Sequence, residues 1–209
     1  MMLNQFALRT TIILPTILAT MSQIQAQDAD MSFFITSVNP GNGADLGGLA
    51  GADTHCGALA EAAGATGKTW RAYLSTDVEN ARERIGKGPW MNAKGITVAL
   101  NVDDLHSDNN KLSKENSLDE TGAVVNGRGD SPNRHDILTG SNADGTLVGD
   151  ACSFWTSSGE GSAMVGHHDR QGGGAEPTSW NAAHGSRGCG LEALRGTGGD
   201  GLYYCFATE

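Results

Sequence analysis

Histidine and carboxylate side chains gather in the second half of the chain, where they could bind a metal ion or a polar ligand. They form three short groups, His135-Asp136, His167-His168-Asp169, and Trp180-Asn181 with His184. Imidazole and carboxylate groups are ligands of Zn²⁺ and similar ions. Their spacing matches no established metal motif. The same side chains could instead hydrogen-bond to one another and to the backbone, and so hold glycine-rich loops in place.

The adjacent histidines cannot both serve one site if they lie on a strand. Successive side chains of a strand point to opposite faces of the sheet, so a shared ion would bind at most one of His167 and His168. Loops such as those around these residues often carry binding surfaces. A polar ligand pocket, a metal site and a purely structural hydrogen-bond network therefore all remain open.

Aromatic residues offer a second kind of site, a platform on which a sugar or an apolar ligand could stack. Trp180 is the best candidate, because it lies between Ser179 and Asn181 in a predicted loop. Trp70 and Trp155 lie in strand-like patterns, where a tryptophan more often belongs to the core. A core position is open for Trp180 as well.

Motifs of the common enzyme classes are missing from the sequence. It contains no G-x-S-x-G elbow, no H-E-x-x-H, no P-loop and no dinucleotide-binding fingerprint. If the four cysteines pair, no thiol nucleophile remains. We therefore predict a protein without catalytic residues. A hydrolase that uses a His/Asp pair or a metal site is the alternative.

The first 26 residues are predicted to be a signal peptide. Arg9 precedes an apolar run over residues 11–20, and a polar stretch ends at Ala26. The run is shorter than the roughly 20 apolar residues that span a bilayer. An uncleaved anchor is the alternative. We expect a secreted or periplasmic protein in which residues 27–209 form one domain, with no membrane contact after cleavage.

The charge of the chain argues against several classes of partner. The 209 residues include 14 basic and 24 acidic side chains, and Arg9 is the only charged residue before Ala26. Residues 27–209 therefore hold 13 basic and 24 acidic groups, a net charge of −11. Such a surface repels nucleic acid, heparin-like polyanions and anionic lipid. Neutral carbohydrate, cations and a basic protein partner remain compatible.

The pattern of the remaining sequence predicts an α+β domain with long loops. Runs rich in β-branched and aromatic residues indicate strands, and apolar residues at helical spacing indicate helices. We predict strands at 32–38, 69–75, 151–156 and 201–207, a turn and another strand within 90–99, and helices at about 55–63 and 78–85. Residues 101–130, with a helical turn near 112–118, and residues 160–179 are predicted loops.

Three blocks of the chain resemble endostatin-like domains, which have a C-type-lectin-like fold. The first contains Trp-Arg-Ala-Tyr-Leu-Ser at 70–75, the second Cys-Ser-Phe-Trp at 152–155, and the third Leu-Tyr-Tyr-Cys-Phe at 202–206. The resemblance extends over about residues 32–207. It implies two short helices, a mixed or antiparallel sheet and long loops.

The resemblance also bears on cysteines and ligands. The four cysteines alone allow three connectivities, whereas the family pattern implies Cys56 with Cys205 and Cys152 with Cys189. The calcium-binding tripeptides of sugar-binding C-type lectins are incomplete here. The first histidine is His55, so the N-terminal zinc ligands of the family are missing as well. No motif supports a Ca²⁺ or Zn²⁺ cofactor.

These observations favour an extracytoplasmic binding module for carbohydrate or a protein partner. The ligand-binding candidates are His135, Asp136, His167, His168, Asp169, Trp180, Asn181 and His184. A structural or matrix-interaction protein without a small-molecule site is the alternative. A simple geometric test separates them, because a binding site requires His135, His167 or His168, Asp169 and His184 to converge in an open cleft.

Overall fold

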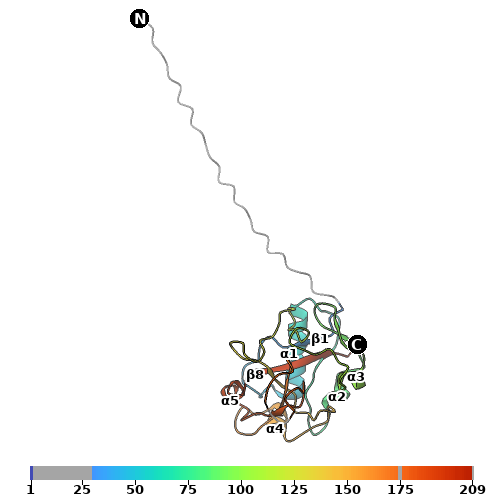
Figure 1. Cartoon of the computed structure of the whole chain (residues 1–209), viewed down its shortest axis with the longest axis vertical. Coiled ribbons are helices and arrows are strands. Elements are labelled where there is room, and N and C mark those ends of the chain that lie inside the picture. Colours follow the sequence, from blue (N-terminus) through green and yellow to red (C-terminus); the bar gives the residue numbers. More distant parts are fainter. Residues whose placement is uncertain (2–29, 174–175, 209) are drawn as a thin grey trace.

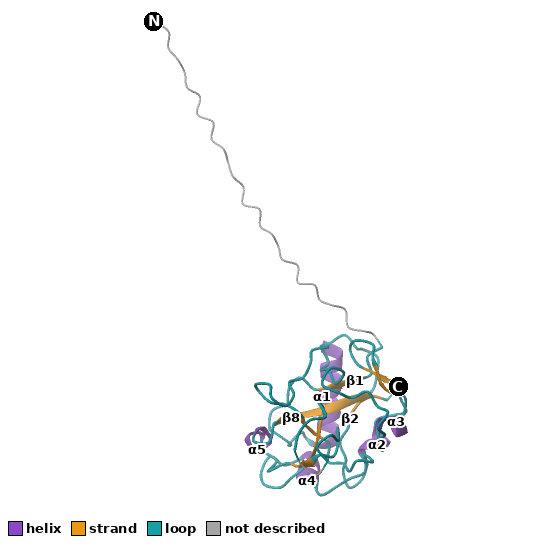
Figure 2. Cartoon of the chain, in the orientation of Figure 1, coloured by secondary structure: helices purple, strands orange, loops and turns teal. Residues whose placement is uncertain are grey.

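The structure is a computed structural model, and it describes Met1, residues 30–173 and residues 176–208 (Figure 1). Apart from Met1, the predicted signal peptide lies outside the described residues. Within them, no helix has the length and apolar character needed to cross a membrane. Helices and strands alternate along the chain and are joined by long loops, which make up much of the molecule (Figure 2). This confirms the predicted α+β class.

A long C-terminal strand organises the main sheet. Strand β8 (Gly199–Ala207) pairs antiparallel with β1 (Phe33–Ile35) and β2 (Trp70–Ala72) and parallel with β5 (Asp136–Leu138). From β5 the sheet continues antiparallel through β6 (Met164–His167) to β7 (His184–Gly185), which gives the order β1-β8-β5-β6-β7. Both ends of the domain thus meet in one sheet.

The sheet is buried on both faces, because its strands alternate between two apolar clusters. Along β8, Tyr203 and Cys205 belong to one cluster, whereas Tyr204 and Phe206 belong to the other. The predicted alternation of strand side chains accounts for this arrangement. Where β5 begins and β6 ends, the same alternation leaves the polar side chains of Asp136 and His167 on one face of the sheet.

The first helix and two disulfides secure the sheet. Helix α1 (Gly48–Ala62) packs against β2, and Cys56 on this helix is bonded to Cys205 of β8. The second disulfide joins Cys152 to Cys189. Both pairings are those implied by the family resemblance.

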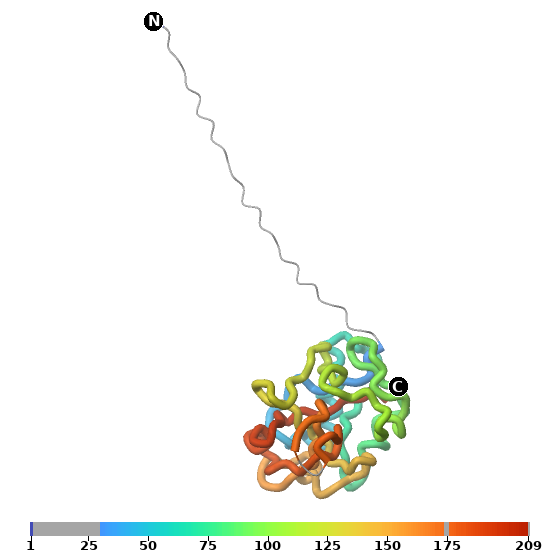
Figure 3. Tube along the Cα trace, in the orientation of Figure 1, coloured from blue at the N-terminus to red at the C-terminus, as the bar shows by residue number. Residues whose placement is uncertain are grey.

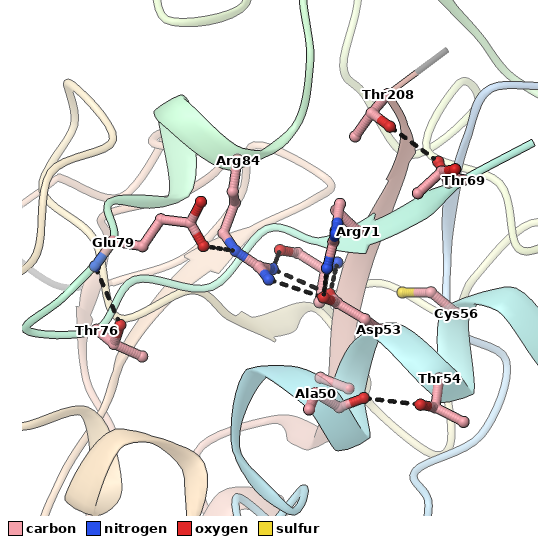
Figure 4. Close-up of polar contacts among 12 residues, drawn as sticks. Ala50, Asp53, Thr54, Cys56, Thr69, Arg71, Thr76, Glu79, Arg84 and Thr208 are labelled. Carbon is pink, nitrogen blue, oxygen red and sulfur yellow. Dashed lines mark hydrogen bonds and ion pairs between the residues drawn. The ribbon is translucent and has the colours of Figure 1, made fainter.

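An ion-pair network holds α1, β2 and the short helix α2 (Ala81–Arg84) together (Figure 4). The carboxylate of Asp53 on α1 accepts hydrogen bonds from Arg84 at 2.8 and 3.0 Å and from Arg71 on β2 at 2.6 Å. Arg84 also lies 3.0 Å from a carboxylate oxygen of Glu79. The Arg84 side chain is only 3% exposed, so its charge depends on these partners.

The remaining elements are short. Strands β3 (Trp90–Met91) and β4 (Thr97–Ala99) form a separate two-stranded sheet, followed by helix α3 (Val102–Leu105). Helix α5 (Leu191–Arg195) precedes and packs against β8. The loops of the last third of the chain, orange and red in Figure 3, lie together on one side of the molecule.

Three local predictions were wrong. Residues 151–156 do not form a strand; they contain α4 (Ala151–Trp155), whose residues have positive φ values from 43° to 70°. The disulfide of Cys152 and the buried Trp155, which donates to Ser75 O at 2.9 Å, accompany this unusual turn. Helix α1 begins seven residues before the predicted start. Residues 160–179, predicted as a loop, contain strand β6. The helical turn predicted near 112–118 is present, since Ser117 N donates to Ser113 O at 2.8 Å, and α3 is an additional helix within residues 101–130.

Candidate functional site

The pairing of strands β5, β6 and β7 places three of the candidate side chains on one face of the sheet. Asp136 lies directly opposite His167 in the antiparallel β5–β6 pair. His184 lies opposite Val165, two residues before His167, in the β6–β7 pair. Opposed residues and residues two apart share a face, so the register alone brings Asp136, His167 and His184 together. His135 immediately precedes β5 and joins them.

One carboxylate oxygen is the centre of this group. Oδ1 of Asp136 lies 3.1 Å from Nε2 of His135, 3.3 Å from Nε2 of His167 and 3.5 Å from Nε2 of His184. His135, Asp136 and His167 are all buried, and the side chain of His184 is 25% exposed. The rings of His135 and His167 stack with centroids 4.4 Å apart. We call these four residues the histidine–aspartate cluster.

The other nitrogen of each ring faces a backbone carbonyl. Nδ1 of His135 lies 3.0 Å from Gln171 O, Nδ1 of His167 lies 2.7 Å from Pro177 O, and Nδ1 of His184 lies 3.1 Å from Gly185 O. A carbonyl can only accept, so each Nδ1 donates its proton there. Neutral imidazoles in this arrangement carry a free lone pair on Nε2, directed at the cluster.

Asp169 and two glycines fix the orientation of the rings. Asp169 Oδ1 lies 3.5 Å from Nδ1 of His135, and its carboxylate accepts from the backbone nitrogens of Arg128 and Gln171. At Gly172 a Cβ atom would lie 2.3 Å from the His167 ring, and at Gly198 it would lie 2.8 Å from the His135 ring. Only glycine leaves room for the rings at these two positions.

Contacts within the cluster shift the pKa values of its members. Burial alone would raise the pKa of Asp136, but the contacts with His167 and His184 outweigh burial and lower that pKa to about 2. Contact with Asp136 raises the pKa of His184. Burial lowers the pKa of His135, yet the contacts with Asp169 and Asp136 outweigh it and leave that pKa raised. Asp136 is therefore an anion at neutral pH.

The three histidines of the cluster, His135, His167 and His184, line a cavity of about 490 Å³, and the buried His135 and His167 mark its inner end. Residues from four loops and from β6 and β7 line the cavity, among them Arg128, Asn133, His135, His167, His184 and Arg187. Arg128 and Arg187 are exposed at its mouth. Among the described residues, no carboxylate forms an ion pair with either guanidinium. The prediction of a binding site required these side chains to converge. His135, Asp136, His167 and His184 do converge, and Asp169 lies behind His135.

Five of the eight predicted site residues do not line this cavity. Asp136 and Asp169 contact the histidines that do, whereas the other three lie apart from the cluster. His168 points away from His167, as expected for neighbours on a strand, and its Nε2 lies 3.1 Å from Asn126 O. Trp180 is 3% exposed and packs against Tyr73 and Tyr204 in the core. The prediction that it forms an exposed platform was wrong.

Asn181 is also buried, and its side-chain amide donates to Tyr73 Oη at 3.0 Å and to two backbone carbonyls. Trp70, Trp90 and Trp155 are buried as well, at 5%, 0% and 0% exposure. None of the four tryptophans can therefore stack on a ligand. Sequence reasoning also missed Arg128, Asn133 and Arg187, because isolated polar residues in loops carry no spacing pattern.

The arrangement can bind polar and charged groups. The arginines at the mouth offer hydrogen bonds to an anion, and the inner end presents imidazole nitrogens around a carboxylate. His135, Asp136 and His167 each have one possible metal-ligand atom within 4.8 Å of the others. Neither the models of known protein families nor the curated proteins include a match to this chain.

Proposed function

We propose that the protein is an exported, non-catalytic binding module whose cavity takes an acidic carbohydrate. The observation that carries this proposal is the pair of arginines, Arg128 and Arg187, at the mouth of one cavity. The chain as a whole has a net charge of −10, so two positively charged side chains that line one cavity are a local exception. Arginine matches the planar carboxylate of an acidic sugar through paired hydrogen bonds.

The size and lining of the cavity agree with a small polar ligand. Its volume of about 490 Å³ lies within the usual range for ligand sites. Asn133 and the imidazoles of His135 and His184 offer further donors and acceptors for hydroxyl groups. With all four tryptophans buried, recognition of a neutral sugar by stacking is unsupported. An acidic ligand is therefore favoured over a neutral one.

The domain type and the compartment are part of the same proposal. The two disulfides agree with an oxidising compartment, such as the periplasm or the extracellular space. We propose a C-type-lectin-like, endostatin-like domain because Cys56–Cys205 joins the first helix to the last strand, beside the paired terminal strands β1 and β8. The predicted leader over residues 1–26 agrees with export.

Isothermal titration with glucuronate oligosaccharides tests the function. We expect binding of the acidic sugar and none of the matching neutral glucose oligosaccharide. The double variant Arg128→Ala/Arg187→Ala should weaken binding roughly 10- to 100-fold, because two charge-assisted hydrogen-bonding groups are lost.

The matched control is Lys87→Ala/Lys94→Ala, which also removes two positive charges, but from exposed positions that do not line the cavity. It should bind like the unmodified protein. Equal loss in both double variants would show a nonspecific charge effect and contradict the proposal. No binding of either sugar would favour the structural, matrix-interaction alternative.

A further inference from the structure

The histidine–aspartate cluster leaves buried polar atoms without hydrogen bonds. Both carboxylate oxygens of Asp136 and Nε2 of His167 are buried and have no hydrogen-bond partner among the described residues. Burying such atoms unsatisfied is costly, and a carboxylate is the most costly of all. The cluster therefore calls for a partner that can satisfy several acceptors at once.

A proton does not resolve this conflict. A proton on one Nε2 joins a single imidazole to Asp136 and leaves the other two lone pairs facing the same oxygen. Protonation of all three rings would put three cations in contact around one carboxylate, with His135 and His167 stacked at 4.4 Å. One divalent cation, in contrast, accepts all of these lone pairs together.

The spacing of the atoms agrees with a small tetrahedral ion. Zn²⁺ binds imidazole nitrogen and carboxylate oxygen at roughly 2.0–2.1 Å, which places neighbouring ligand atoms of a tetrahedron about 3.3 Å apart. The three imidazole nitrogens lie 3.1, 3.3 and 3.5 Å from Oδ1 of Asp136. The possible ligand atoms of His135, Asp136 and His167 also lie within 4.8 Å of one another. His184 adds its Nε2 at 3.5 Å from Oδ1 of Asp136.

The surroundings of the rings have the form of a second coordination shell. Ligand histidines usually donate the proton of their other nitrogen to a carbonyl or carboxylate, which leaves the metal-binding nitrogen unprotonated. All three rings do so toward backbone carbonyls, at 2.7 to 3.1 Å. Asp169 adds a carboxylate behind His135.

We propose that His135, Asp136 and His167, with His184 as the fourth ligand, bind one Zn²⁺ ion at the inner end of the cavity. This site goes beyond the binding of an acidic carbohydrate and does not depend on it. Nitrogen ligands favour zinc over Ca²⁺ and Mg²⁺, which take oxygen ligands. His184, the most exposed of the four, is the ligand nearest to the open cavity.

The test uses the disulfide-bonded protein without a histidine tag, after treatment with a chelator and dialysis. Titration calorimetry with ZnCl₂ at pH 7.5 should give one submicromolar site per chain and no site for CaCl₂. At a hundredfold excess over Kd, zinc should raise Tm by roughly 5–10 °C. Zinc bound in another stoichiometry, or calcium bound in its place, would overturn the proposal.

Variants locate the ion. Asp136→Asn keeps the shape of the side chain but removes its charge, and its amide can donate to Nε2 of a neighbouring imidazole. We expect a metal-free variant that remains folded, with zinc affinity reduced roughly 100-fold or more and the zinc-induced rise in Tm abolished. His184→Ala should weaken zinc binding less than His167→Ala. If zinc binding survives Asp136→Asn and His167→Ala, the ion lies elsewhere.

His55→Ala is the matched control, since His55 lies on α1 and its Nε2 contacts Val38 O. It should bind zinc normally. Should the cluster variants fail to fold, X-ray absorption at the zinc edge of the unmodified protein decides the question. Imidazole nitrogen and oxygen at about 2.0–2.1 Å support the site, and sulfur at about 2.3 Å contradicts it.

Different experimental outcomes would refute the proposed sugar ligand and the proposed zinc site. Arg128→Ala/Arg187→Ala should lose the acidic sugar yet keep one zinc ion, because neither arginine belongs to the cluster. Zinc binding without sugar binding would refute only the proposed ligand. Sugar binding by a protein that takes up no zinc would refute only the metal site.

Discussion

The position of Asp136 on its strand determines which neighbouring side chains share its face of the sheet. It is the first residue of β5, and its side chain emerges at the end of the face that carries Leu138 in the core. His167 opposite it points to the same face, whereas His168, one residue later, contacts Asn126 on another side of the sheet. The two-residue period therefore divides a pair of adjacent histidines between two environments.

His106 is a half-buried histidine with a different role. Its Nδ1 donates to Val102 O at 2.7 Å, so its Nε2 accepts from the hydroxyl of Tyr73 at 2.7 Å. This arrangement requires a neutral ring. Burial is the largest influence and lowers the pKa of His106. The charged groups near it are Arg82, which also lowers this pKa, and Asp103 and Asp144, which raise it but do not outweigh burial.

This geometry predicts a pH dependence of stability. The unfolded chain takes up a proton on His106 near pH 6.5, before the folded protein does, so the unfolding free energy falls as the pH drops from 7.5 to 5. The loss is about 1.4 kcal/mol for each pH unit that separates the two pKa values. Urea unfolding at several pH values should show a flatter profile for His106→Gln. A profile that is unchanged in the variant would contradict this role.

At the scale of elements, the Asp53 network joins α1, β2 and α2 (Figure 4). In the part of the chain that the structure describes, Asp53 alone bonds both Arg84 and Arg71 through its carboxylate. It also accepts from the backbone nitrogen of Ala72 at 2.9 Å. Arg84 is buried, but the Arg71 side chain is 45% exposed. The two arginines should therefore respond very differently to the loss of their partners.

Asp53→Ala should lower the unfolding free energy by about 3–5 kcal/mol, because it leaves the buried charge of Arg84 without its main partner. Arg71→Ala should cost about 1 kcal/mol or less, since its ion pair is exposed to solvent. Urea denaturation measures both. Similar losses in the two variants would show that burial of Arg84 is not the deciding factor.

The strands were easier to predict than their surroundings. Aromatic and β-branched residues marked 32–38, 69–75 and 201–207, and β1, β2 and β8 lie within or overlap these ranges. Helix α1 begins earlier than predicted, in a glycine-containing stretch that is a poor helix former. Gly51 is needed there because a Cβ atom would lie 2.0 Å from Leu46 O. At 151–155 a disulfide and a buried tryptophan override a pattern typical of a strand.

The candidate site was predictable in its chemistry but only partly in its membership. Residue types alone identified His135, Asp136, His167 and His184, and the strand period explains why only one of the adjacent histidines belongs. For Trp180 the sequence left both a platform and a core position open, because its neighbours in sequence are polar whereas its neighbours in space, Tyr73 and Tyr204, come from distant parts of the chain.

For the whole molecule, the two disulfides close loops of very different length. Cys56 and Cys205 are 149 residues apart, and Cys152 and Cys189 are 37 apart. Chain-entropy arguments give stabilisation of about 5 and about 4 kcal/mol, respectively. Cys56→Ser/Cys205→Ser should therefore destabilise the protein more than Cys152→Ser/Cys189→Ser, by about 1 kcal/mol.

Guanidinium unfolding of the two double variants, each with its remaining disulfide intact, measures this difference. A loss of about 5 kcal/mol is comparable to the whole stability of many domains, so the first variant should unfold near body temperature. Greater damage from the shorter loop would mean that native packing around α4, rather than chain entropy, governs the result.

The place of β8 in the sheet has a consequence for the order in which the protein can be made. This strand lies between β1 and β5 and also pairs with β2, yet it spans residues 199–207, which a ribosome adds after every other described strand of the domain. Earlier strands emerge without the neighbour they need, so no stable intermediate can form until translation of β8 is finished. The nascent chain should remain protease-sensitive until that moment and then fold in one late, cooperative step.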